Sequence, residues 1–175
     1  MRKFNTKGIA FLAMLAAISV ILGAFKISIG DSLRITFMNI PIILTSLWFG
    51  PFAGIAVGLI ADFLSANLTT GWFPPLALTP VLFGVIPAML NRFLKRRKGF
   101  IRLFAIILLT NFLGTMLWST YALTLLLGTE YFPLLVLRVP LYLGIAVLET
   151  ICIFYISKSG LEKMVIGNRT KWWFK

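Results

Sequence analysis

Six long apolar runs fill most of the chain between residues 9 and 157, and short polar or Gly/Pro-rich connections separate them. A helix needs about 20 apolar residues to cross the hydrocarbon core of a bilayer, and the longest runs exceed that length. Of all residues, 59% are hydrophobic and 13% are charged, whereas about a quarter are charged in a typical soluble domain. The sequence therefore predicts an integral membrane protein. The runs cover residues 9–25, 35–49, 52–68, 76–94, 101–127 and 133–157.

The cations are grouped, and their positions predict the orientation of the chain. Lysine and arginine number 17 against 5 acidic residues, which gives a net charge of +12. Most of these cations fall in three clusters beside apolar runs, as expected of cytoplasmic loops. Six crossings from a cytoplasmic N-terminus place every cluster and both termini inside, whereas five crossings would expose one cluster. The clusters are Arg2, Lys3 and Lys7; Arg92, Lys95, Arg96, Arg97, Lys98 and Arg102; and Lys158, Lys163, Arg169, Lys171 and Lys175.

The two shortest adjacent runs, 35–49 and 52–68, leave a second topology open, because together they could form one re-entrant hairpin. A charge of +12 also suggests nucleic acid, but clustering beside apolar runs favours anionic lipid headgroups as the partner. We expect an all-α membrane protein of six transmembrane helices, forming one domain over residues 1–175. The expected surroundings are the lipid bilayer, with no nucleic-acid partner.

Several kinds of chemistry are excluded by the residue types that the chain lacks. It has no histidine and one cysteine, Cys152, so neither an internal disulfide nor a multi-thiolate or imidazole metal site can form. A histidine-based hydrolase is excluded for the same reason. No Walker lysine motif occurs, so the chain does not hydrolyse ATP by that route. We therefore predict no catalytic residue, no metal and no cofactor.

Ionisable side chains within the apolar runs are candidates for function, since each costs roughly 2.5–3.5 kcal/mol at a helix centre. Asp62 and Arg138 are expected at similar depth in the outer half, where they could pair with each other or contact a ligand. Arg34 is expected at the outer mouth of the second run. Glu149 lies nearer the cytoplasmic side, and a structural role is favoured for it.

Aromatic residues gather toward the expected external side. Trp72 and Phe73 lie in a Gly/Pro-punctuated connection, a kind of loop that can cover a cavity and stack on a flat ring. Trp118 and Tyr121 are three residues apart and share a helix face. For this pair, ligand stacking and anchoring in the lipid interface both remain open. Phe37 is expected on the same side.

Small residues recur four apart in two of the runs. Gly54 and Gly58 are expected to let neighbouring helices approach closely within the chain. Ala13 and Ala17 form a similar flat stripe on the first helix. For this stripe, contact with another subunit is an alternative to internal packing.

A set of short motifs, taken together, resembles one transporter family. The motifs are RITFMNIP at 34–41, WFGP at 48–51, GLIAD at 58–62, GWFP at 71–74 and NFLGT at 111–115, with Arg138 opening the last helix. In this order and spacing they resemble the substrate-binding S components of energy-coupling factor (ECF) vitamin transporters, in particular the folate-specific branch.

The resemblance implies a fold, partners and a ligand. It implies a six-helix S-component bundle in a prokaryotic plasma membrane that binds a vitamin from outside. It further implies docking on an ECF module, formed by a transmembrane coupling protein and two ATPase subunits, through Ala13 and Ala17 on the first helix. The external connections at 26–34, 69–75 and 128–132 would gate the ligand site. Folate-type members usually continue the Phe-Pro of the second connection with Gly-Phe, where this chain has Pro75 and Leu76.

The same resemblance implies a set of ligand-binding residues. A pterin ring would meet Trp72 or Phe73 and a polar anchor, Asp62 or Asn67, and the anionic tail of folate would meet cations. Another vitamin such as thiamine or riboflavin, a solitary facilitator, and a lipid-modifying enzyme are the alternatives. The substrate-binding candidates are Lys26, Arg34, Phe37, Asp62, Asn67, Trp72, Phe73, Pro74, Trp118, Tyr121 and Arg138.

Overall fold

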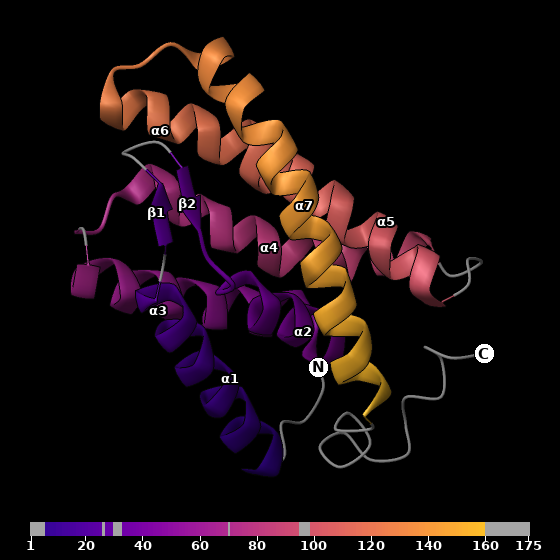
Figure 1. Ribbon diagram of the computed structural model, residues 1–175. Helices are drawn as coiled ribbons and strands as arrows, with labels where there is room; N and C mark the ends of the chain where they lie inside the picture. The colour runs from indigo at the N-terminus through magenta and orange to yellow at the C-terminus, as the bar shows by residue number, and fades with distance from the viewer. Residues whose placement is uncertain (1–5, 26, 30–32, 70, 95–98, 160–175) are drawn as a thin grey trace.

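The computed structural model describes residues 6–25, 27–29, 33–69, 71–94 and 99–159 (Figure 1). In this part of the chain, helices dominate and one short hairpin precedes the second helix. The elements are α1 Thr6–Ala24, β1 Ile27–Ile29, β2 Leu33–Ile35, α2 Asn39–Phe49, α3 Pro51–Thr69, α4 Pro74–Phe93, α5 Gly99–Asn111, the π-helix η1 Phe112–Ser119, α6 Thr120–Leu127 and α7 Tyr131–Lys158.

The helices form two groups that meet along α4. In the first group α3 packs along both α1 and α4, and α2 fills the space between them. In the second group α7 packs against α5, η1 and α6, which run as one long continuous helical rod. The long α7 crosses in front of this bundle in Figure 1. Many large apolar side chains on the outside are exposed, including Phe52, Phe93 and Val136, as expected of a surface that faces lipid.

Helices α3 and α4 are in backbone contact because glycines face each other. A Cβ atom added at Gly84 would lie 2.6 Å from the carbonyl carbon of Gly54, and one added at Gly58 would lie 2.8 Å from the Pro80 oxygen. The Ser46 hydroxyl of α2 donates to the Gly84 oxygen at 2.6 Å in the same place. The expected packing role of Gly54 and Gly58 is therefore confirmed.

The connection between the first two helices differs from the sequence prediction. Residues 26–34 were expected to be a polar connection, but β1 and β2 pair antiparallel there, with Ile27 opposite Ile35. Consequently α2 begins at Asn39, four residues later than predicted. Pro41 then falls in the first turn of α2, where a proline costs no intrahelical hydrogen bond. Because the helix begins after the strand, Pro41 lies at the start of a helix and not in a helix interior.

Helix lengths bear on how the chain meets the bilayer. Within the described residues, four helical stretches are long and apolar enough to cross a membrane: Pro51–Thr69, Pro74–Phe93, Gly99–Leu127 and Tyr131–Lys158. The apolar stretch Gly8–Ala24 is slightly shorter, and α2 has 11 residues, a length of about 16 Å. Its first ten residues are all buried. The second run is therefore a short central helix enclosed by its neighbours.

Candidate ligand-binding site

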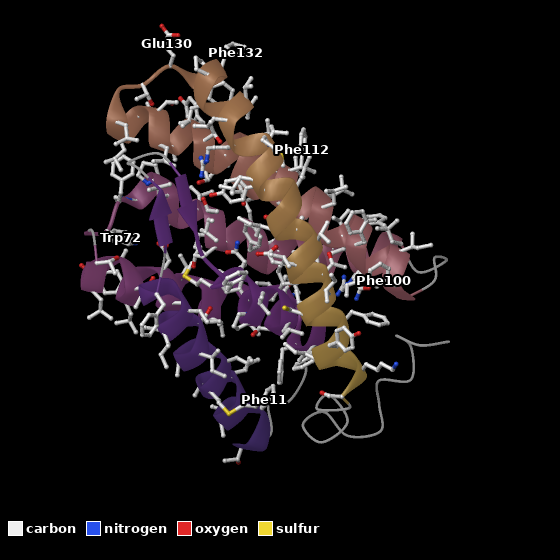
Figure 2. The ribbon with its side chains drawn as sticks, viewed as in Figure 1. Phe11, Trp72, Phe100, Phe112, Glu130 and Phe132 are labelled. Carbon is white, nitrogen blue, oxygen red and sulfur yellow. The ribbon has the colours of Figure 1, made fainter. Side chains whose placement is uncertain are left out.

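A cavity of about 320 Å³ opens where α3 ends and α4 begins, next to the hairpin. Its volume falls at the lower end of the range of small-molecule sites. Figure 2 shows Trp72 at this connection between α3 and α4. The cavity is lined by Gly23, Thr36, Met38, Asp62, Ser65, Ala66, Gly71, Trp72, Phe73, Leu76 and Leu126.

The backbone of the α3–α4 connection sets the positions of the two aromatic residues. Gly71 has φ +86°, a conformation that favours glycine, and its N–H donates back to the Ala66 oxygen at 2.8 Å. Phe73 is extended, and Pro74 starts α4 as its first residue, the position at which proline is best tolerated. Trp72 and Phe73 are therefore held between a fixed helix end and a fixed helix start.

The walls of the cavity combine an aromatic side with a polar side. The Trp72 ring meets the Phe63 ring edge-on at 5.6 Å between centroids, and the Trp72 side chain is 41% exposed. Asp62 is half-buried and, among the described residues, is the one ionisable side chain that lines the cavity. A carboxylate accepts hydrogen bonds, and an indole presents a flat apolar face. This arrangement suits a planar ligand that carries N–H donors.

Side chains that the sequence did not single out complete the polar side. The Thr36 hydroxyl donates to the Leu22 oxygen at 3.3 Å and accepts from the Met38 N–H at 3.2 Å. The Ser65 hydroxyl lies 3.3 Å from the Asp62 backbone oxygen and 3.6 Å from the Met38 sulfur. Thr36 and Met38 fall in the RITFMNIP motif, but their run was expected to be helical, which hid their place in the wall.

The predicted site residues separate into three groups. Asp62, Trp72 and Phe73 come together in the cavity wall. Lys26 and the side chain of Arg34 lie outside the described residues, although the backbone of Arg34 pairs with Ser28 in the hairpin. The remaining candidates are described but do not line the cavity, and these are Phe37, Asn67, Pro74, Trp118, Tyr121 and Arg138.

Several of these remaining candidates make contacts that explain their positions. Trp118 donates from Nε1 to the Pro75 oxygen at 2.9 Å, which ties η1 to the start of α4. Its ring lies 6.0 Å from that of Tyr121, which is exposed. Exposed Asn67 donates to the Phe63 oxygen one turn earlier at 2.7 Å. Phe37 packs partly buried against the central apolar core.

Arg138 is fully enclosed, in a polar cluster separate from the cavity wall. Its guanidinium donates to Thr120 Oγ1 at 3.0 Å, to Tyr142 Oη at 3.0 Å and to Ser119 Oγ at 3.5 Å. The guanidinium carbon also lies 5.0 Å from the centre of the Tyr142 ring. Among the described residues, the contacts of Arg138 are therefore with hydroxyls and a ring, and pairing with Asp62 is not seen.

Glu149 forms a second buried polar cluster, deeper in the bundle. Asn111 Nδ2 donates to Glu149 Oε2 at 2.7 Å, and the Asn39 side chain also interacts with this carboxyl group. The Thr115 hydroxyl lies 3.4 Å from Asn111 Oδ1. The cluster links α2, α5, η1 and α7, in keeping with the structural role that the sequence favoured for Glu149.

Comparison with known proteins identifies the family. No curated protein sequence matches the chain. A solved structure described as "FolT bound with folic acid" matches with a TM-score of 0.73 and 26% sequence identity, covering 86% of this chain and 94% of that chain. The sequence model of a family described as the substrate-specific component of ECF transporters matches residues 7–165. The chain therefore belongs to the substrate-specific components of ECF transporters, which are membrane transport subunits and not enzymes.

Proposed function

We propose that this chain binds folate, or a reduced folate, from the external side of the membrane and delivers it inward together with an ATP-driven ECF module. The observation that carries the proposal is the match to a FolT structure bound with folic acid, which extends over 94% of that protein. The cavity at the α3–α4 connection supports it, because its walls offer an aromatic surface and a carboxylate.

The proposed roles follow from the chemistry of a folate. Its pterin ring is planar and carries an amino group and a ring N–H, which suit stacking on Trp72 or Phe73 and hydrogen bonding to Asp62. The glutamate tail carries two carboxylates, which Lys26, Arg34 and Arg138 would recognise. The other candidates would shape or support the walls around the ring, and these are Pro74, Phe37, Asn67, Trp118 and Tyr121.

The first helix is the proposed contact with the coupling protein of the ECF module. Ala13 and Ala17 are exposed on α1, and Ala13 lines an apolar groove of about 440 Å³ between α1 and α3. Small residues line its floor, including Ala13, Ala16 and Ala53, and such residues let another helix approach closely. This surface supports docking of a transmembrane partner, with two ATPase subunits bound to that partner.

The proposed setting is the plasma membrane of a prokaryotic cell, crossed six times by one domain with both termini in the cytoplasm. The positions of the basic clusters support this topology. The short, enclosed α2 would cross as part of the bundle. Neighbouring helices and the hairpin would then provide hydrogen-bond partners for the backbone N–H and C=O groups at its two ends.

Ligand identification by mass spectrometry tests the proposed function. The protein is purified in a mild detergent from cells grown with folates, and small molecules released on denaturation are identified. We expect folic acid or a reduced folate at close to one equivalent. Recovery of thiamine, riboflavin or another vitamin would reassign the ligand within the family, and protein that stays empty and is not stabilised thermally by any vitamin would contradict the proposal.

A further inference from the structure

Ser65 places a hydroxyl in the cavity wall whose hydrogen-bonding capacity is largely unused. Its two contacts in the described part of the chain are 3.3 Å to the Asp62 backbone oxygen and 3.6 Å to the Met38 sulfur. An O–H···O bond is normally about 2.5–3.0 Å long, and both contacts are to acceptors, so the lone pairs of the Ser65 oxygen stay available. The Thr36 hydroxyl, by contrast, both donates and accepts. Of these two hydroxyls, Ser65 is therefore the one that can turn toward a ligand.

Gly23, near the end of α1, keeps this hydroxyl uncovered. A Cβ atom added at Gly23 would lie 2.9 Å from Ser65 Oγ and 2.8 Å from both Ser65 Cβ and the Met38 sulfur. The methionine sulfur could move aside, but Ser65 Cβ is fixed to the α3 backbone. A side chain at position 23 would therefore lie against the hydroxyl or displace it. Because Gly23 also lines the cavity, its missing side chain leaves Ser65 Oγ at the cavity surface.

Ser65 shares a helix face with the carboxylate of the cavity. Asp62, Ser65 and Ala66 all line the cavity, as expected of residues three and four apart on one helix. A helix advances about 1.5 Å per residue, so Ser65 lies about 4.5 Å beyond Asp62 along α3, nearer the α3–α4 connection. The hydrogen-bonding groups of two fused six-membered rings extend over a similar length. This face of α3 can therefore contact both rings of a pterin.

The order of the two side chains fits one orientation of the ligand. In the proposed function, Asp62 bonds to the amino group and ring N–H, which belong to the pyrimidine ring of the pterin. The pyrazine ring, which carries the tail, then lies beside Ser65 and on the side of Trp72 (Figure 2). Both pyrazine nitrogens are acceptors in folic acid and carry hydrogen in tetrahydrofolic acid. A hydroxyl can bond to either form, because it donates and accepts.

We propose that Ser65 binds a pyrazine nitrogen of the ligand, and that its rotatable hydroxyl lets the site take both oxidised and fully reduced folates. The inference rests on the proposed function and names a specificity-determining residue for it. Ser65 donates to the nitrogen of folic acid and accepts from the N–H of tetrahydrofolic acid. Gly23 is a positioning residue, because it acts by leaving the hydroxyl open to the cavity.

The test removes the hydroxyl from the protein and the nitrogen from the ligand. Dissociation constants are measured by titration calorimetry for the purified wild type, S65A and G23A. The ligands are folic acid, tetrahydrofolic acid kept under nitrogen, and the 5-deaza and 8-deaza analogues of folic acid, each of which has a C–H in place of one pyrazine nitrogen. The exposed Ser159 at the end of α7 provides the matched control S159A. Thermal unfolding without ligand shows which variants are folded.

We expect S65A to bind folic acid and tetrahydrofolic acid each about 3- to 10-fold more weakly than the wild type, as the loss of one neutral hydrogen bond predicts. One deaza analogue should bind the wild type about as weakly as folic acid binds S65A, and S65A should not weaken it further. The other analogue should behave like folic acid. G23A should also weaken folic acid binding, and S159A should not.

Four results would overturn the inference while leaving the proposed folate function intact. The first is folded S65A that binds folic acid as tightly as the wild type. The second is an equal loss of folic acid and both deaza analogues in S65A, which would make the role of Ser65 structural. The third is a loss confined to one oxidation state, and the fourth is folded G23A with wild-type affinity.

Wild-type protein that binds none of the four ligands contradicts the proposed function itself, and this inference with it.

Discussion

The contact between α3 and α4 allows a substitution whose cost follows from geometry. In Gly84→Ala, the added methyl would lie 2.6 Å from the Gly54 carbonyl carbon and 2.6 Å from the Ile55 nitrogen. Carbon atoms in favourable contact are about 3.5 Å apart, so the two helices must separate by about 0.9 Å. Both neighbouring atoms belong to the backbone, and no flexible side chain can absorb the shift.

Overpacking of this kind costs about 1–3 kcal/mol. For a chain of this size, each kcal/mol shifts the midpoint of thermal unfolding by about 2–4 °C, so G84A should unfold about 2–12 °C below the wild type. The matched control is Gly144→Ala on α7, where an added methyl meets nothing within 4 Å. Alanine favours a helix over glycine by about 0.5–1 kcal/mol, so G144A should be as stable as the wild type or slightly more stable.

Thermal unfolding in detergent, followed by tryptophan fluorescence, measures both variants under the same conditions. Because α3 carries Asp62 and α4 begins beside Phe73, separating the helices should also weaken ligand binding in G84A and leave it unchanged in G144A. The reasoning is refuted if G84A unfolds at or above the wild-type temperature, or if G144A is destabilised as much as G84A.

Three further predictions concern single contacts. E149Q keeps an acceptor for Asn111 and should stay close to wild-type stability. E149L leaves the buried Asn111 amide without this acceptor and should lower the free energy of unfolding by about 1–3 kcal/mol. Equal unfolding temperatures for the two variants would contradict this role of Glu149. W118F removes the donor to the Pro75 oxygen and should speed folic acid release several-fold in stopped-flow fluorescence, while an unchanged rate would show that this tie does not hold the wall. G71A forces an alanine to φ +86° and should cost about 1–2 kcal/mol in thermal unfolding, so wild-type stability would show that the turn adapts.

Most of the helical architecture could be predicted because apolar run length determines it in a membrane. The predicted helix at 52–68 is Pro51–Thr69 in the structure, and the one at 133–157 is Tyr131–Lys158. The predicted start of the second helix was wrong. Ile35 to Met38 continue the apolar run, and a strand followed by a turn can have the same composition as the first turn of a helix. The π-helix Phe112–Ser119 was not predicted. A π-helix differs from an α-helix in which carbonyl oxygen each backbone N–H bonds, and the pattern of hydrophobic residues does not distinguish the two.

The candidate site was predicted in part. Asp62 stood out because a charge in an apolar run is costly, and Trp72 and Phe73 stood out because glycine and proline flank them. Thr36 and Ser65 carry no such signal, and only the fold brings them to the cavity. One partner of Arg138 could have been found, because Tyr142 follows it by one helical turn. Ser119 and Thr120 depend on how two helices pack, which spacing alone does not reveal.

Folic acid binding at the α3–α4 cavity is the central claim, and equilibrium binding of radiolabelled folic acid tests it most directly. The wild type is compared with W72A and with F132A, whose ring is 76% exposed at the start of α7 away from the cavity. We expect saturation at one ligand per protein, at least about 10-fold weaker binding by W72A, and no change in F132A. Absence of saturable folic acid binding by folded wild-type protein, or equal effects of W72A and F132A, would contradict the account.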